Sequence, residues 1–358
     1  MNPAHSYIFE SKDYIIIMQP KKNLLSKDIK FELIFDEENQ EIHLKKISSE
    51  KKEGWQEIIY LYFFHKITKK QKIIYIGSSS KNEIKKKIQL EEKKVFFCLT
   101  SIPSRANNVE ILKNNLEYLL QTQTEKIEKI YISIPKNYLR FEDTVNPEII
   151  QQLERYDKIE IIYLEKDYGP GSKYIGPLIH KYEELKNNIM IVIDDDRKYN
   201  KYLVQHFKIA HASFPDSKFL TGEWNLFFQP YYYDIREEEL DMYEVQENKN
   251  NPIKRGTGLG GFYGFALIVQ ESMKEFLDYH LQIIENVKNA QFHDEGISLS
   301  YIKNKEEAIL FLKHKGCFTI FQEPDALWKE TQYNRHIIQN DILKYTQENH
   351  LLNNNVNI

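Results

Sequence analysis

From residue 95 onward, short runs of apolar residues alternate with longer segments in which apolar side chains recur at helical spacing. The short runs predict buried strands, and the spaced segments predict amphipathic helices between them. Strands that alternate with helices favour a mainly parallel sheet with right-handed crossover connections. We expect strands at 95–99, 130–134, 159–164 and 190–193, with helices at 109–120, 148–155 and 174–184.

The first 76 residues have a different pattern, in which short stretches rich in aromatic and β-branched residues are separated by polar turns. This pattern predicts a small antiparallel sheet or sandwich. Its strands are expected at 14–18, 31–35, 41–46, 57–64 and 72–76. The charged segment 82–94 has sparse apolar positions and is interpreted as a linking helix.

The chain therefore divides into three parts. Residues 1–90 form a small β-rich accessory domain, residues 91–330 form an α/β domain, and residues 331–358 form a C-terminal helix with a frayed tail. The first two parts are the expected domains, and a count of two domains agrees with a length of 358 residues.

Composition narrows the class of protein. The 49 Lys and Arg residues are balanced by 53 Asp and Glu residues, so global electrostatics give no case for binding nucleic acid. Two cysteines, Cys98 and Cys317, exclude a disulfide framework and a Cys-rich zinc site. Residues 1–10 lack a basic region followed by an apolar stretch, and no window reaches about 18 apolar residues, so we expect neither secretion nor membrane spanning. We expect a cytoplasmic protein, and peripheral association with the cytoplasmic face of a membrane stays open.

Three consecutive acids, Asp194, Asp195 and Asp196, directly follow the strand expected at 190–193. In an extended chain Asp194 and Asp196 share one face, while Asp195 points away. Adjacent carboxylates repel each other, and a hard divalent cation such as Mg²⁺ or Mn²⁺ relieves that repulsion. The alternative is an acidic turn that caps a helix starting near Arg197, but capping explains one acid and not three.

Two further loops follow expected strands and should open at the same edge of the sheet. Thr-Ser-Ile-Pro-Ser-Arg occupies 100–105, and Asp-Tyr-Gly-Pro-Gly-Ser-Lys occupies 167–173. In the second loop, main-chain N–H groups that lead into a helix favour an anion, and Lys173 adds a positive charge. A purely structural Gly-Pro turn is the alternative.

Two segments in the C-terminal half carry candidate chemistry. Residues 255–264 contain a G-x-G-x-x-G pattern, but it does not lie between a strand and a helix, so a dinucleotide fingerprint is excluded. A loop that lets a ligand approach the main chain is favoured instead. Asp294 and Glu295 precede an expected helix, where a carboxylate would either cap the helix or act as a general base.

With these residues in place, the segment from about Val95 to Tyr301 resembles nucleotide-sugar-dependent glycosyltransferases of the GT-A fold. Five motifs carry the resemblance in the family's order, and that order is more specific than any single motif. The last motif departs from the family, which often has Glu-Asp or Asp-Asp where this chain has Asp294-Glu295. The motifs are the turn at 100–105, the Asp-Tyr-Gly-Pro-x-x-Lys loop at 167–173, the Asp-x-Asp element at 194–196, the Gly-rich stretch at 260–264 and the acidic pair at 294–295.

The resemblance implies a Rossmann-like GT-A domain that transfers a sugar, such as a hexose, from a UDP- or GDP-sugar to a hydroxyl group. The acceptor would be a glycan or a lipid-linked or protein-linked group. Mn²⁺ or Mg²⁺ would bind Asp194 and Asp196, and Asp294 or Glu295 would be the general base of an inverting reaction. The implied donor-contacting residues are Thr100, Ser101, Pro103, Arg105, Asp167, Lys173, Asp195, Gly260 and Gly261.

Two other functions fit parts of the pattern. A strand followed by Asp-x-Asp also introduces the aspartyl-phosphate chemistry of phosphohydrolases, but Lys198 and Tyr199 stand where a small Thr or Val usually follows. An inactive carbohydrate-binding protein would present aromatic residues around Trp55 and Trp224, and would need neither nucleotide nor divalent ion. Tyr60 and Tyr62 would join Trp55 in such a platform, although aromatic residues in strands usually pack in a core, which we favour.

Overall fold

The computed structural model describes most of the chain and divides it into two compact units. The first comprises Met1–Glu92, His206–Ser217 and Met242–Glu244, and the second comprises the remainder. The described residues are 7–20, 30–47, 59–76, 81–222, 241–243, 259, 264–305, 309–313, 317–319, 334–349 and 351.

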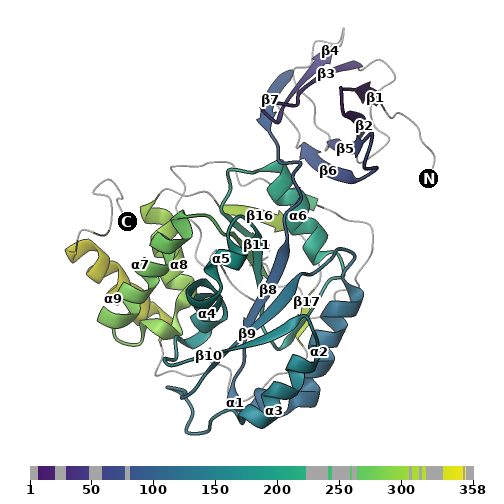
Figure 1. Cartoon of the computed structure of the whole chain (residues 1–358). Coiled ribbons are helices and arrows are strands. Elements are labelled where there is room, and N and C mark those ends of the chain that lie inside the picture. The colour runs from purple at the N-terminus through teal and green to yellow at the C-terminus, as the bar shows by residue number, and fades with distance from the viewer. Residues whose placement is uncertain are drawn as a thin grey trace. The chain divides into compact units, whose positions relative to one another are not determined.

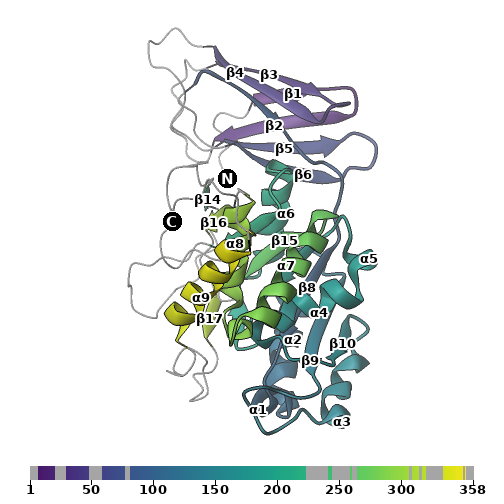
Figure 2. The same cartoon turned by 90° about the vertical axis from the view of Figure 1, so that its left-hand side faces the viewer.

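The first unit contains two antiparallel sheets, as the alternating pattern predicted (Figure 2). Apolar side chains from both sheets, among them Met18, Leu44 and Phe63, form its core. One sheet has the order β1 (Tyr7–Glu10), β2 (Tyr14–Pro20), β5 (Ile59–His65) and β6 (Gln71–Ile76). The other has the order β3 (Lys30–Asp36), β4 (Glu41–Ile47) and β7 (Glu83–Lys87).

The linking helix expected at 82–94 is wrong, because strand β7 occupies the start of that segment. Ile84 lies opposite Leu44 in an antiparallel pair with β4. Sparse apolar positions are compatible with the helical period and with the strand period. The segment forms a strand because the free edge of β4 offers main-chain hydrogen-bond partners.

Tyr60 belongs to the core of the first unit and is not a platform for a sugar. Its side chain is buried, and its ring meets that of Tyr75 edge to face, with centroids 5.9 Å apart. Trp55 lies outside the described residues.

The second unit is an α/β structure around one sheet, in which its strands have the order β10-β9-β8-β11-β15-β13-β16. The four predicted strands form the parallel part, and every residue of β11 is buried. The mainly parallel α/β fold preceded by a small antiparallel β unit is therefore confirmed. The parallel strands are β8 (Val95–Thr100), β9 (Lys129–Pro135), β10 (Ile159–Leu164) and β11 (Ile189–Val192). The other strands are β15 (Phe265–Ile268), antiparallel to β11, then β13 (Phe219–Gly222) and β16 (Ile309–Lys313). Strand β14 (Asp241–Tyr243) begins in residues of the second unit and ends in residues of the first.

Helices cover both faces of this sheet (Figure 1). On one side lie α1 (Pro103–Ala106), α2 (Val109–Thr122) and α3 (Pro147–Ile150) with the 3₁₀ helix η1 (Gln151–Arg155). On the other lie α4 (Ser172–His180), α5 (Tyr182–Leu185), α7 (Ser272–Asn286), α8 (Asp294–Asn304) and α9 (Arg335–Glu348). Helix α6 (Leu203–Ser213) begins in the second unit and ends in the first. None of the helices in the described ranges is long and apolar enough to cross a membrane.

Helix α4 is seated directly on strand β9. A Cβ atom added at Gly176 would lie 2.3 Å from the hydroxyl oxygen of Ser133. Helix α4 can therefore approach β9 this closely only because residue 176 has no side chain. The helix expected at 174–184 is interrupted at Lys181, which leaves the helical region before α5 begins. The close contact fixes the N-terminal turn of α4 at the edge of the sheet where β8, β10 and β11 end.

Candidate active site

The three consecutive acids emerge from the end of β11, and a short strand follows them. Strand β12 (Arg197–Tyr199) pairs with β17 (Cys317–Thr319) in a two-stranded sheet. A helix starting near Arg197, the alternative explanation of the acids, is therefore wrong. Pairing with β17 keeps the chain extended, and the acids do not cap a helix.

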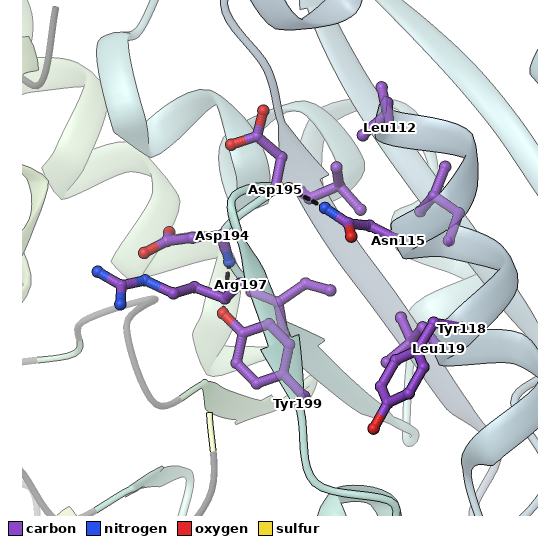
Figure 3. A pocket seen from close by; sticks show the side chains of 11 residues that line it. Leu112, Asn115, Tyr118, Leu119, Asp194, Asp195, Arg197 and Tyr199 are labelled. Carbon is purple, nitrogen blue, oxygen red and sulfur yellow. Dashed lines mark hydrogen bonds between the residues drawn. The ribbon is translucent and has the colours of Figure 1, made fainter. Parts of the chain in front are cut away.

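Asp195 turns its carboxylate toward the loop that follows β8. Its Oδ2 accepts hydrogen bonds from Ser101 Oγ at 2.5 Å and from Arg105 Nε at 2.8 Å. Its main-chain oxygen accepts one from Asn115 Nδ2 at 2.9 Å, and Figure 3 shows its side chain directed away from that of Asp194. Burial raises the pKa of Asp195, although Arg105 opposes the rise. Asp195 thus joins the ends of β8 and β11.

Asp194 turns toward helix α4. Its main-chain N–H donates to the Tyr199 hydroxyl at 2.8 Å, and its Oδ1 accepts from Lys173 Nζ at 3.2 Å. Lys173 Nζ also lies 3.6 Å from Oδ2 of Asp294, and only 7% of the lysine side chain is exposed. Burial alone lowers the pKa of Lys173, but Asp194, Asp294 and Glu295 outweigh burial and raise it, so the ammonium stays charged.

Asp196 lies near two arginines, and both contacts are 3.5 Å or longer. Arg105 Nη1 lies 3.6 Å from its Oδ2, and Arg197 Nε lies 3.5 Å from its Oδ1. Burial and repulsion from Asp194 and Asp195 raise its pKa to about 6 against these two arginines. A further positive charge at this carboxylate would relieve the repulsion.

The donor atoms available here fit a hard divalent cation. Asp194 and Asp196 supply carboxylate oxygens, and 31% and 24% of their side chains are exposed. Within the described ranges no group of three or more His, Cys, Asp or Glu side chains could hold a metal ion. Two carboxylates suffice for Mg²⁺ when substrate phosphates and water complete its shell.

The loop at 167–173 is fixed by its own side chains and by a glycine. Asp167 accepts hydrogen bonds from the main-chain N–H groups of Leu139 at 2.9 Å and Gly169 at 2.8 Å. Gly169 has φ +60°, and a Cβ atom there would lie 2.2 Å from the main-chain oxygen of Gln291. The loop, which includes the 3₁₀ helix η2 (Gly169–Gly171), is thereby held against the segment that leads into α8.

The end of β8 and the loop after it are held by hydrogen bonds from side-chain hydroxyls to main-chain oxygens. Thr100 Oγ1 donates to the main-chain oxygen of Ser133 at 2.7 Å. The Tyr138 hydroxyl donates to the main-chain oxygen of Ser101 at 2.8 Å. Pro103 is buried in the first turn of α1, which carries Arg105. Sequence reasoning missed Tyr138, although its position just beyond the end of β9 is a signal that could have found it.

Asp294 and Glu295 form the first turn of α8 and face different partners. The Asp294 carboxylate is buried, and its Oδ2 has no hydrogen-bond donor among the described residues apart from the ion pair with Lys173. Glu295 is 39% exposed and lies 3.2 Å from Nη1 of Arg335 on α9. Gly260 and Gly261 lie outside the described residues.

A small cavity lies behind the acidic turn (Figure 3). Leucines of α2 line it, including Leu112 and Leu119, and Asn115 and Tyr199 stand at its polar end. It has room for about one water molecule, so it is a packing void and not a ligand site. Its apolar wall lowers the local dielectric around Asp194 and Asp195.

Comparisons with known proteins find only distant structural likeness. No protein-family model matches the chain, and no curated protein matches it in sequence. The solved structure of residues 1–349 of Staphylococcus aureus TarS in complex with UDP-GlcNAc is 14% identical, with a TM-score of 0.44. The match covers 70% of this chain and 66% of the TarS chain, a little under two thirds.

Two other structures are similarly distant. Mouse xyloside xylosyltransferase 1 in its apo form is 13% identical over 62% of this chain and 85% of its own, with a TM-score of 0.31. A putative glucose-1-phosphate thymidylyltransferase from Bacillus anthracis in complex with a sucrose is 10% identical over 62% and 87%, with a TM-score of 0.34. Likenesses this distant assign no activity to the chain.

Proposed function

We propose that this chain is a glycosyltransferase that moves a sugar, such as a hexose, from a UDP- or GDP-sugar to a hydroxyl acceptor. One observation carries the proposal. Lys173 Nζ contacts Asp194 after β11 and Asp294 at the start of α8. Lys173 thus places the acids suited to holding a cation, at 194–196, in one site with the acids suited to proton transfer, at 294–295. This arrangement agrees with the order of motifs that resembles GT-A glycosyltransferases.

The acids after β11 and the loop after β8 make up the donor side. Asp194 and Asp196 would hold Mn²⁺ or Mg²⁺, which supplies Lewis-acid stabilisation of the diphosphate when bound. Arg105 lies beside Asp196 and would neutralise phosphate oxygens. Arg105 Nε donates a hydrogen bond to Asp195, and this bond orients the guanidinium group before a donor binds.

Lys173 contributes to the departure of the leaving group. As the bond between the anomeric carbon and the β-phosphate oxygen breaks, its electron pair remains on that oxygen, and negative charge grows on the diphosphate. The buried ammonium of Lys173 is a fixed positive charge in a site of low dielectric, where such a charge stabilises the developing anion most.

The acids of α8 make up the acceptor side. The acceptor oxygen forms the new bond to the anomeric carbon, and its proton passes to the carboxylate of Asp294 or Glu295. A carboxylate base opposite the leaving group predicts inversion at the anomeric carbon. Such a base typically contributes about 10²–10⁴ in rate.

Thermal unfolding with UDP and GDP, each with and without Mn²⁺, tests the donor site. Ligands that bind the native state raise the midpoint of unfolding. We expect a nucleotide to raise it when Mn²⁺ is present, and Asp196→Ala to abolish both this shift and sugar transfer. Asp278→Ala, which removes an exposed acid of α7, is the matched control and should retain both. A wild-type protein that no nucleotide stabilises, or unchanged metal-dependent transfer by Asp196→Ala, would contradict the proposal.

An assay of the released product separates sugar transfer from phosphoester hydrolysis. A phosphohydrolase would release inorganic phosphate from simple phosphoesters without any sugar acceptor. We expect no such release, and we expect release of UDP or GDP from the corresponding sugar nucleotide instead.

A further inference from the structure

The two acids that begin α8 have unequal access to an incoming acceptor. Asp294 is 6% exposed, and its Oδ2 faces the buried ammonium of Lys173. Glu295, the next residue, has a side chain that is 39% exposed. A general base must reach the hydroxyl proton that it removes, so exposure favours Glu295 for that task. The contact of Asp294 with Lys173 suits a counter-ion.

A cationic partner of Glu295 lies on helix α9. Arg335 is the first residue of α9, and its Nη1 lies 3.2 Å from Glu295 Oε2. The charged groups that act on Glu295 are Asp294 on its own helix, Arg335 on α9, Lys173 on α4 and Asp194 after β11. The positive charges that act on Glu295 are therefore those of Arg335 on α9 and Lys173 on α4.

Helix α9 does not need Arg335 for its own stability. Asn334 caps it by accepting hydrogen bonds from the main-chain N–H groups of His336 and Ile337, and Ile338 and Ile342 anchor it in the core. A cation in the first turn of a helix opposes the helix dipole, and no acidic residue in that turn compensates it. The position of Arg335 is thus unfavourable for the helix and favourable for Glu295.

Helix α9 also packs against α8 near the start of that helix. A Cβ atom at Gly296 would lie 2.2 Å from Oε1 of Gln339 on α9 and 2.3 Å from the ring of His293. The glycine after Glu295 therefore allows α9 to approach, and the spacing between Arg335 and Glu295 is fixed by packing.

We propose that Arg335 is a positioning residue that holds Glu295 as the general base, while Asp294 serves as the counter-ion of Lys173. This assignment rests on the proposed glycosyltransferase function. It extends the site to α9, beyond the segment from Val95 to Tyr301 in which the resemblance lies. Arg335 acts through Glu295 and has no contact with the reacting atoms.

Kinetics of Arg335→Gln, Arg335→Lys and Glu295→Gln test the assignment, with release of UDP or GDP from a UDP- or GDP-sugar as the readout. Glu295→Gln should lower kcat about 10²–10⁴-fold. Arg335→Gln should lower kcat about fivefold with an unchanged KM for the donor, because a half-exposed ion pair contributes little. In the pH profile of kcat/KM, the fall in activity on the acidic side should occur about half a pH unit higher for Arg335→Gln than for wild type. Removing the cation makes Glu295 easier to protonate. Arg335→Lys should restore the position of that fall.

Three further measurements distinguish positioning from a structural role. Arg335→Gln should not lower the midpoint of thermal unfolding, since the cation opposes the dipole of α9. Lys344→Gln removes another cation of α9, one that pairs with the exposed Glu348, and should leave kinetics unchanged. In the Glu295→Gln background, Arg335→Gln should have no further effect on kcat.

The outcomes separate this assignment from the proposed function. An active wild type whose pH profile is unchanged on the acidic side by Arg335→Gln would overturn the role of Arg335 alone. Near-normal kcat in Glu295→Gln together with a large loss in Asp294→Asn would reverse the roles of the two acids. A wild type that releases no nucleotide from any UDP- or GDP-sugar would overturn the proposed function and this assignment with it.

Discussion

The ammonium of Lys173 lies 3.6 Å from Oδ2 of Asp294 and so links helix α4 to helix α8 through a buried ion pair. The same ammonium contacts Asp194 at 3.2 Å. One cation thus keeps two carboxylates together that would otherwise repel each other. Its removal should be felt on both sides of the candidate site.

We expect Lys173→Met to lower the free energy of unfolding by about 3–5 kcal/mol, because it leaves a buried carboxylate without its partner. Urea unfolding at neutral pH with a chelator measures the loss. Adding Asp294→Asn should recover part of it by removing the surplus negative charge. Lys274→Met removes an exposed cation of α7 and should cost far less. Equal losses for Lys173→Met and Lys274→Met would show that the buried pair has no special weight.

Asp195→Asn should lower the free energy of unfolding by about 1.5–3 kcal/mol, the range for hydrogen bonds to a charged group. The substitution weakens two hydrogen bonds that join the ends of β8 and β11, from Ser101 and Arg105. Ser101→Ala should cost less, and the double variant should cost less than the sum because both changes remove one shared contact. Additive losses in urea unfolding would rule out this coupling.

Gly169→Ala should destabilise the protein more than Gly264→Ala, although both glycines have positive φ. A side chain at either position meets a strain of about 1–2 kcal/mol for the left-handed conformation. At Gly264 the nearest atom to an added Cβ is 3.7 Å away, whereas at Gly169 it is a main-chain oxygen at 2.2 Å. Denaturant unfolding of the two variants isolates the cost of that clash. A larger loss for Gly264→Ala would contradict the packing of the loop against Gln291.

Stability should fall as the pH drops below about 6.5, partly because of His280. Burial lowers the pKa of His280 to about 3 from an ordinary value of 6.5. The unfolded chain therefore takes up a proton on this residue between those two pH values while the folded chain does not, so its contribution is present above pH 6.5 and is lost toward pH 3.

His280→Gln isolates that contribution. We expect the free energy of unfolding of wild type to decrease by up to about 1.4 kcal/mol per pH unit more than that of the variant between pH 6 and pH 4. Parallel pH profiles for the two proteins would show that His280 is not buried in its neutral form.

The sequence was most informative where one stretch of chain determines its own structure. The run at 189–193 is apolar throughout and three acids follow it, so both its burial and the edge of the sheet at which it ends could be predicted. The positions along the chain of the four parallel strands, and of helices between them, were predicted from the spacing of apolar residues. The loop at 167–173 was recognisable because its glycines and proline exclude regular structure.

The parts that sequence could not supply depend on distant partners. Strand β7 forms because β4 offers an open edge, and β12 forms because β17 pairs with it. Arg335 meets Glu295 only because α9 packs on α8, and no local spacing connects the two residues. Which partner each of Asp194, Asp195 and Asp196 takes was likewise decided by neighbouring elements, since alternation gives only the side toward which a residue points.

The contact between Gly176 and Ser133 has a consequence for the evolution of this chain. Because a Cβ at position 176 would collide with the Ser133 hydroxyl, the two positions share a fixed amount of space. In related sequences we expect a residue other than glycine at 176 only together with glycine or alanine at 133. Substitutions of Ser133 on β9, a residue with no proposed catalytic role, are therefore coupled to substitutions of Gly176 on the helix that carries Lys173. Changes at positions 133 and 176 should be accepted in pairs.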